Sequence, residues 1–183
     1  MCVFVFYLQF INEDWKFIAP QKILPENCND SEDIKIISHA TDLIPERSFR
    51  DSPDNIEDHQ VHAVYLLPCE KEDRKFDVKS NIQFSLIAIN KWFIDKSSNQ
   101  KIIFDKKFDS SIDVTFIRVN KTMNWFTGST SKEKDDRDVG LKIENIILSN
   151  SDLFNNFENK KFIIFFEGWE KRKSLFFDIC GKS

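Results

Sequence analysis

Apolar residues gather in short runs along this chain of 183 residues, and their spacing changes from one run to the next. Residues 61–68 are apolar except for His62, and the run ends at a proline. Such a run is typical of a strand that is buried on both faces of a sheet. Over residues 112–119, Ile112, Val114 and Phe116 alternate with other residues, which predicts a second strand with these side chains on one face.

Helical spacing appears between these two strands. Apolar residues recur there at every third or fourth position, namely Ile82, Leu86, Ile89 and Phe93. This period predicts an amphipathic helix over residues 80–96. Ser80 and Gln83 have the spacing of a capping box, in which the two side chains bond to free backbone N–H groups at the helix start.

The remaining pattern predicts a second helix over residues 137–148 and short strands at 101–105, 162–166 and 175–180. Asp109-Ser110-Ser111 suits a turn between two of the strands. From residue 61 onward the predicted order is β-α-β-β-α-β-β. We therefore expect an α+β fold, with a single mixed β-sheet of about five strands and two packed helices.

Residues 1–58 have a different character, and we predict two parts for the chain. Residues 1–58 form an N-terminal arm, mostly irregular with short strands, and residues 59–183 form the α+β subdomain. Four prolines and several Asp/Asn clusters favour turns in the arm, with one short strand at 34–38. The apolar residues 1–10 predict a buried strand, although a truncated signal sequence is an alternative.

Composition narrows the class of protein. Hydrophobic residues make up 41% and charged residues 31% of the chain, so it is expected to fold as a globular domain. The formal net charge of −4 argues against a nucleic-acid partner, which usually requires a basic surplus. No apolar segment approaches the length of about 20 residues that a membrane span requires. The 19 Phe residues fall largely in the predicted strands, so they need no ligand to explain them.

The four cysteines, Cys2, Cys28, Cys69 and Cys180, include no C-x-x-C pair. A zinc ribbon and a thioredoxin-like motif therefore have no support. Two disulfides with three possible pairings, or buried free thiols, remain open at this point. Cys69 follows a strand end, where functional groups often lie, but no motif relates it to a histidine.

Histidine offers little catalytic chemistry in this chain. Only His39, His59 and His62 occur, and the odd spacing of His59 and His62 in an extended segment sends their rings to opposite faces. We expect His62 to be a hydrogen-bonded structural residue. No H-E-x-x-H, G-x-S-x-G or Gly-rich phosphate motif occurs. The residues themselves therefore indicate no catalytic, cofactor-binding or metal site.

A family resemblance adds to this interpretation. Its residues are the stretch 58–68, the pair Asp73-Arg74, the helix ending in residues 88–93, and the strands at 101–105 and 112–118. Residues 161–168 and 179–183 also have counterparts. Together they resemble the pre-active-site portion of a bacterial, secreted zinc-metallopeptidase-like family with a zincin-type fold.

The resemblance implies a zincin-like N-terminal subdomain that positions an extended peptide substrate, often as an added strand at a sheet edge. In zincins the zinc ligands lie on a later helix with the H-E-x-x-H motif, where the metal activates a water. No histidine follows His62 before the last residue, Ser183. We therefore expect no cofactor in this chain, and zinc only if a longer parent protein carries the catalytic helix.

Two functions follow as expectations. The first is a substrate-side subdomain of a zinc-metallopeptidase-like protein, inactive as this isolated chain and either a fragment or a descendant of such a peptidase. The alternative is a non-catalytic α+β module that holds a peptide or protein strand at a sheet edge. The resemblance also implies a secreted or periplasmic location. From the net charge and the short apolar segments we expect no nucleic-acid or membrane partner.

Overall fold

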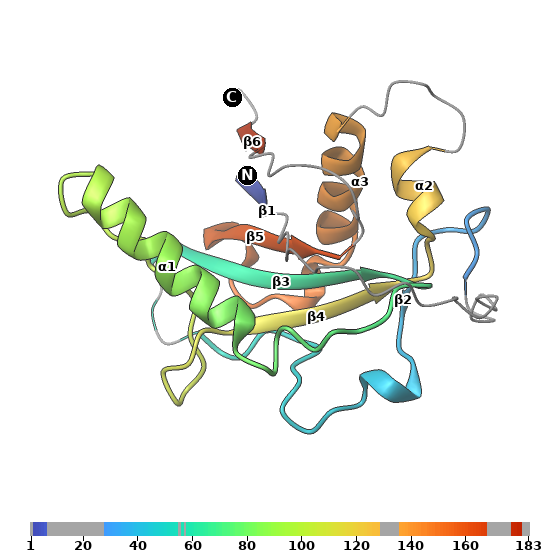
Figure 1. Cartoon of the computed structure of the whole chain (residues 1–183), viewed down its shortest axis with the longest axis horizontal. Helices are drawn as coiled ribbons and strands as arrows, with labels where there is room; N and C mark the ends of the chain where they lie inside the picture. Colours follow the sequence, from blue (N-terminus) through green and yellow to red (C-terminus); the bar gives the residue numbers. More distant parts are fainter. Residues whose placement is uncertain are drawn as a thin grey trace, which may run out of the picture.

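A computed structural model describes residues 2–6, 28–54, 56, 58–128, 136–167 and 177–180, with backbone alone for 2–6, 136–137 and 177–180. Six strands form one mixed sheet in the order β2-β4-β3-β5-β1-β6 (Figure 1). The strands are β1 (Cys2–Phe6), β2 (Ile36–Ile37), β3 (Gln60–Pro68), β4 (Val114–Val119), β5 (Lys160–Phe166) and β6 (Phe177–Cys180). The central strands β4, β3, β5 and β1 run parallel, whereas β2 and β6 are antiparallel to their neighbours.

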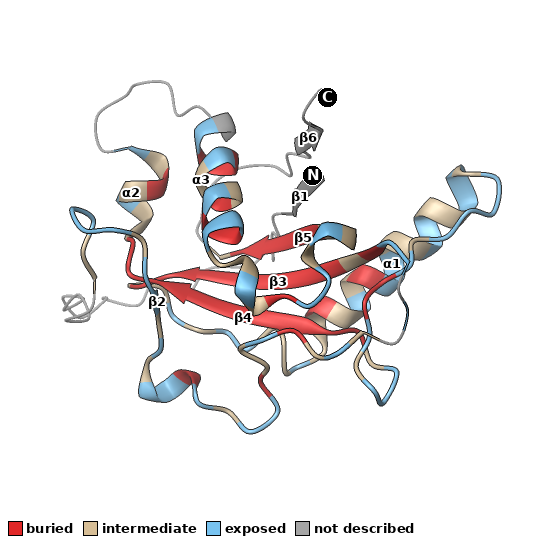
Figure 2. Ribbon diagram, turned by 180° about the vertical axis from the view of Figure 1, so that it is seen from behind, coloured by how far each residue is buried: buried red, intermediate tan, exposed pale blue. Residues whose placement is uncertain are grey.

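Helices cover both faces of this sheet (Figure 1). Helix α1 (Asn81–Lys96) packs on one face, and α2 (Met123–Thr127) and α3 (Asp136–Ser149) lie on the other. Side chains of β3 alternate between the two layers, because successive residues of a strand point to opposite faces. Tyr65 packs with the α1 layer, and Val64 and Leu66 pack with the α3 layer. Figure 2 shows β3, β4 and β5 buried along their length, as the apolar run of residues 61–68 predicts.

Residues 28–48 of the N-terminal arm follow the outer edge of β4, whereas β1, at the start of the arm, lies between β5 and β6. Strand β2 pairs with Arg118 and Val119, and Ser48 forms an isolated bridge with Thr115. A disulfide between Cys28 and Cys69 joins the arm to the end of β3. The arm therefore covers the β4 edge with short pieces of extended chain.

The α+β class and the mixed sheet are confirmed, but the count of five strands is not, and the zincin-like subdomain stays a prediction. The sheet has six strands, of which β2, β4, β3 and β5 are those with described side chains. The helices predicted over 80–96 and 137–148 are present as α1 and α3, and α2 was not predicted. Of the described helices, none combines the length and apolarity needed to cross a bilayer.

Two local predictions are wrong. Residues 101–105 form no strand, because β4 pairs with β3 from Ala63 onward and leaves Val61 alone to bridge Phe104. The capping box at the start of α1 is absent as well. Ser80 has a φ of 62°, in the left-handed region, and its side chain makes no capping hydrogen bond. The hairpin-like turn near Asp109 is present, where Lys106 bridges Ile112 in antiparallel fashion.

Candidate functional site

An open groove lies between helix α1 and the segment 101–112, and its shape follows from how that segment is held. Asn90 of α1 donates to the carbonyl of Ile102 at 3.2 Å and accepts from its N–H at 2.9 Å. The backbone of Ile103 and Asp105 bonds to Val61 of β3. The segment is therefore fixed to the helix and to the sheet at separate points, and the groove between them is preformed.

The groove has a volume of about 740 Å³ and a mainly apolar lining. Half of its lining residues are Ile or Phe, including Ile56, Ile87, Ile94, Ile102, Ile103 and Ile112. Of the described residues, the charged ones in its lining are three lysines, namely Lys91, Lys101 and Lys106. A preformed apolar concavity with a few polar groups at its rim is the usual form of a ligand site.

Apolar surface continues from the groove onto the outer face of α1. Phe84 is 69% exposed, Ile87 57% and Trp92 61%. Residues four apart in a helix lie on the same face, so Phe84, Ala88 and Trp92 form a row next to Ile87 of the groove. Figure 2 shows that part of α1 is exposed. Contiguous exposed apolar surface of this kind often marks a protein-interaction site.

A second group of side chains is buried at the amino ends of the parallel strands. We call Lys160, Asp51, Asp54, Asp105 and His62 the Lys160 cluster. The Lys160 ammonium contacts all three carboxylates, and its nitrogen lies 2.7 Å from Asp54 Oδ1. Each of these five side chains is at most 2% exposed. The cluster therefore holds three acidic groups and one permanent cation away from water.

His62 connects the Lys160 cluster to β4. Its Nδ1 lies 2.7 Å from Asp105 Oδ2, and its Nε2 lies 2.9 Å from Thr115 Oγ1. Its ring also packs edge-on against Phe154 and Phe162. His62 is thus a buried, hydrogen-bonded residue, as expected. His59, by contrast, is exposed, and its Nδ1 lies 3.3 Å from the carbonyl oxygen of Asn159.

The Lys160 cluster contains a set of atoms that could ligate a metal. Ligand atoms of Asp51, His62 and Asp105 lie within 4.8 Å of one another. Lys160, however, already contacts both of these carboxylates. Burial lowers the pKa of Lys160, but the hydrogen bonds to the carboxylates outweigh burial and raise it, so the ammonium stays charged. The His and Asp donors are ordinary zinc ligands, but a charged lysine in this position opposes a second cation.

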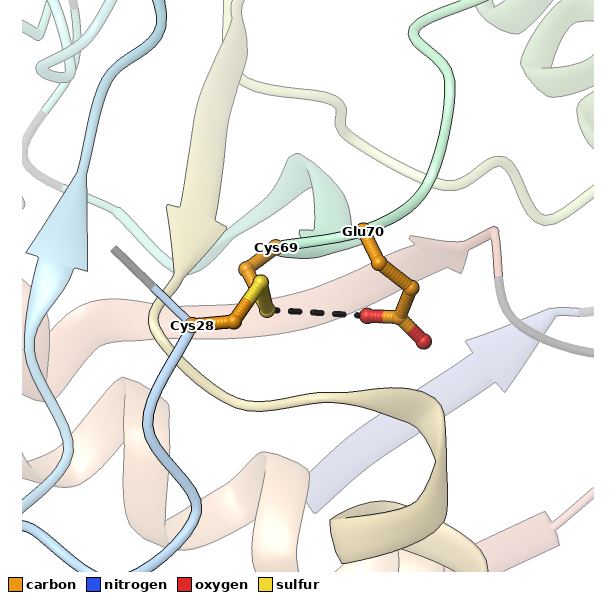
Figure 3. A group of neighbouring side chains, drawn as sticks. All are labelled: Cys28, Cys69 and Glu70. Carbon is orange, nitrogen blue, oxygen red and sulfur yellow. Dashed lines mark hydrogen bonds between the residues drawn. A yellow bond between two sulfur atoms is a disulfide. The ribbon is translucent and has the colours of Figure 1, made fainter. Parts of the chain in front are cut away.

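A third group lies at the carboxyl ends of the strands. Arg118 of β4 forms two hydrogen bonds with Asp42, and Arg47 binds Asp73 and Asp77. Figure 3 shows the Cys28–Cys69 disulfide beside Glu70, whose Oε2 is 3.6 Å from Cys69 Sγ. The two sulfur atoms are bonded to each other, so Cys69 is not a free nucleophile and this group is not a thiolate metal site.

Glu167 follows β5 at the same end of the sheet. It accepts a hydrogen bond from the Tyr65 hydroxyl and lies 2.8 Å from Arg74 Nε. Burial raises the pKa of Glu167, and burial together with the nearby Glu167 charge raises that of Tyr65. The ion pairs between arginines and carboxylates at this end hold the arm and the loop after β3 to the sheet.

The sequence did not reveal the groove or the Lys160 cluster. The spacing of the helix predicts Ile82 and Leu86 as buried, and leaves Phe84, Ile87 and Trp92 off the buried face. That surplus of apolar residues on the outer face was the one signal for the groove. Asp51 and Lys160 are 109 residues apart, and no local pattern relates them.

No protein-family model, curated protein or solved structure was found to match this chain.

Proposed function

We propose that this chain is a non-catalytic, peptide-binding subdomain of the zinc-metallopeptidase type. It would hold a peptide or protein segment without cleaving it. The observation that carries the proposal is the preformed apolar groove between α1 and residues 101–112, with the exposed apolar row of α1 beside it. An apolar concavity of this size suits two or three side chains of an extended peptide.

The chemistry of the buried acids and bases supports a binding role. A general base must lie within hydrogen-bond reach of its substrate. In the described part of the chain, the carboxylates of Asp42, Asp51 and Asp105 are buried and paired with Arg118 or Lys160, so a substrate does not reach them. In the family that the chain resembles, zinc-dependent activity requires the residues of an H-E-x-x-H motif. This sequence does not contain that motif.

The groove is a better docking site than the β4 edge. Addition of a peptide strand requires a row of unpaired backbone groups at an edge. At β4, the N–H of Phe116 already bonds to the carbonyl of Ser48, and the N–H of Asn120 bonds to the carbonyl of Lys35. A peptide at this edge would first have to displace the arm, which the Cys28–Cys69 disulfide retains.

We also propose that the chain is exported, as the resemblance implies. The Cys28–Cys69 disulfide supports this location, because disulfides persist in oxidising compartments and are rare in the cytosol.

Binding of short apolar peptides to the purified chain tests the proposal. We expect saturable binding and no cleavage, and no stoichiometric zinc after dialysis. Ile87→Arg places a charge in the groove and should weaken binding by roughly tenfold or more. Leu43→Arg changes an exposed leucine outside the groove and should leave binding unchanged. One tightly held zinc per chain, or cleavage that a chelator stops, would overturn the proposal, as would binding that Ile87→Arg leaves intact.

A further inference from the structure

We propose that the groove selects a peptide segment whose apolar side chains are flanked by acidic residues. This inference rests on the proposed function and names the chemistry of the occupant. Its basis is the distribution of charge around the groove, which differs from that of the whole chain.

The three charged lining residues are all basic, whereas the chain as a whole has a net charge of −4. Lys91 belongs to α1, and Lys101 and Lys106 belong to the segment on the opposite side. Positive charge therefore borders the groove from both of the elements that form it. Among the residues that the structure describes, no acidic residue lines the groove.

Lys91 and Lys101 are exposed, and no ion-pair partner within the described ranges engages either of them. Lysine stems can lie along apolar surface while the ammonium group stays in water. An occupant that buries apolar side chains among Ile87, Ile94 and Ile102 would bring its flanking residues close to these ammonium groups. Carboxylates at those flanking positions would gain ion pairs, and lysines there would be repelled.

A preference for acidic peptides would be opposite to the one that the negative net charge of the chain favours. The long-range field of an acidic chain attracts cationic peptides and repels anionic ones. A general electrostatic attraction would therefore favour a basic peptide. Selection of an acidic peptide requires local contact with the lysines of the groove.

Three fluorescein-labelled peptides test the inference by fluorescence anisotropy. Each has the centre Leu-Ile-Phe, flanked on both sides by three Glu, three Gln or three Lys residues. We expect the Glu peptide to bind roughly tenfold more tightly than the Gln peptide at low salt, and the Lys peptide to bind most weakly. Because exposed charges are screened, this preference should shrink strongly at about 1 M salt.

A pair of double variants isolates the role of the groove lysines. Lys91→Glu with Lys101→Glu should reverse the order of the Glu and Lys peptides. Lys35→Glu with Lys79→Glu makes the same change in net charge at exposed lysines outside the groove lining and should keep the original order. Thermal melts of both variants check that they remain folded, and all four positions are exposed.

The outcomes separate this inference from the function on which it rests. Equal affinity for the three peptides, or an acidic preference that survives in the Lys91/Lys101 variant, overturns the inference and leaves peptide binding in place. Binding of none of the three peptides overturns both. A groove filled by a second copy of the chain would appear as a dimer in sedimentation that the peptides do not dissociate, and would also overturn the inference.

Discussion

Three carboxylates and one ammonium group share the buried Lys160 cluster, so negative charge is in excess there. Burial raises the pKa of Asp105, but hydrogen bonds from His62 and Lys160 outweigh burial and hold that pKa at about 2. The pKa of Asp51 is shifted in the opposite direction, because burial raises it to about 6 despite the nearby His62 and Lys160. The excess charge is thus relieved by a proton on Asp51 in mildly acidic solution.

This arrangement predicts an unusual pH dependence of stability. Between about pH 4 and pH 6 the folded chain retains a proton on Asp51 that the unfolded chain has already lost. The free energy of unfolding should therefore fall as pH rises through this range, by roughly 2 kcal/mol from this group. In Asp51→Asn the group no longer titrates, so the fall should be clearly smaller, whatever the absolute stability of the variant.

Urea denaturation at several pH values measures this effect. Asp95→Asn is the matched control, because Asp95 is an exposed residue of α1. The control should show the same pH profile as the unmodified chain. An Asp51→Asn profile with the same slope as the unmodified chain between pH 4 and pH 6 would contradict the prediction.

At the scale of the element, helix α1 combines a buried side, one wall of the groove and an exposed apolar row. Ile82 and Leu86 are fully buried against the sheet, whereas Phe84 and Trp92 face away from it. Ser80, directly before the helix, has an unfavourable backbone conformation, because a residue other than glycine in the left-handed region is strained. Since the Ser80 side chain makes no capping bond, nothing in the helix depends on its hydroxyl.

Replacing this serine with glycine tests the account of the helix start. Ser80→Gly should raise the free energy of unfolding by roughly 0.5–1 kcal/mol, because glycine adopts the left-handed conformation without steric cost. Ser85→Gly, five residues further into the helix, should lower it by about 1 kcal/mol or more, because it removes a helix-forming residue and the bond to the Asn81 carbonyl. Thermal or urea unfolding measures both changes, and a loss of stability in Ser80→Gly would refute the account.

Local periodicity predicted most of the elements, and long-range competition explains the failures. The apolar run that became β3, the helical spacing of α1 and the alternation in β4 each depend on neighbouring residues alone. Residues 101–105 have a similar strand pattern, but β4 takes the edge of β3 on which they would pair. The Lys160 cluster also joins residues from distant parts of the sequence, and for that reason pattern alone could not reveal it.

At the scale of the whole molecule, the two ends of the chain meet in the sheet. Strands β1 and β6 are antiparallel neighbours, and Cys2 is directly opposite Cys180 in their register. The Cα atoms of directly opposed residues in antiparallel strands lie about 4.5–5.5 Å apart, a separation that suits a disulfide. With Cys28 already bonded to Cys69, one of the three pairings left open by the sequence remains.

We therefore expect two disulfides in the oxidised chain. Mass spectrometry of non-reduced proteolytic peptides should find Cys28 linked to Cys69 and Cys2 linked to Cys180. Loss of the first link, in a Cys28→Ser and Cys69→Ser double variant, should cost roughly 3–4 kcal/mol, because these cysteines are 41 residues apart and the link restricts the unfolded chain. A free thiol at Cys2 or Cys180 in the oxidised protein would contradict the second link.

The docked arm has a further consequence for the behaviour of the protein in concentrated solution. Strand β2 and Ser48 occupy hydrogen-bonding positions along the outer edge of β4, a strand that is rich in β-branched residues. Uncovered strand edges recruit other chains and lead to aggregation. The arm thus protects the β4 edge from self-association, and the Cys28–Cys69 bond holds the arm there together with the Arg118–Asp42 pair. Reducing agents should consequently lower the solubility of this protein before they unfold its core.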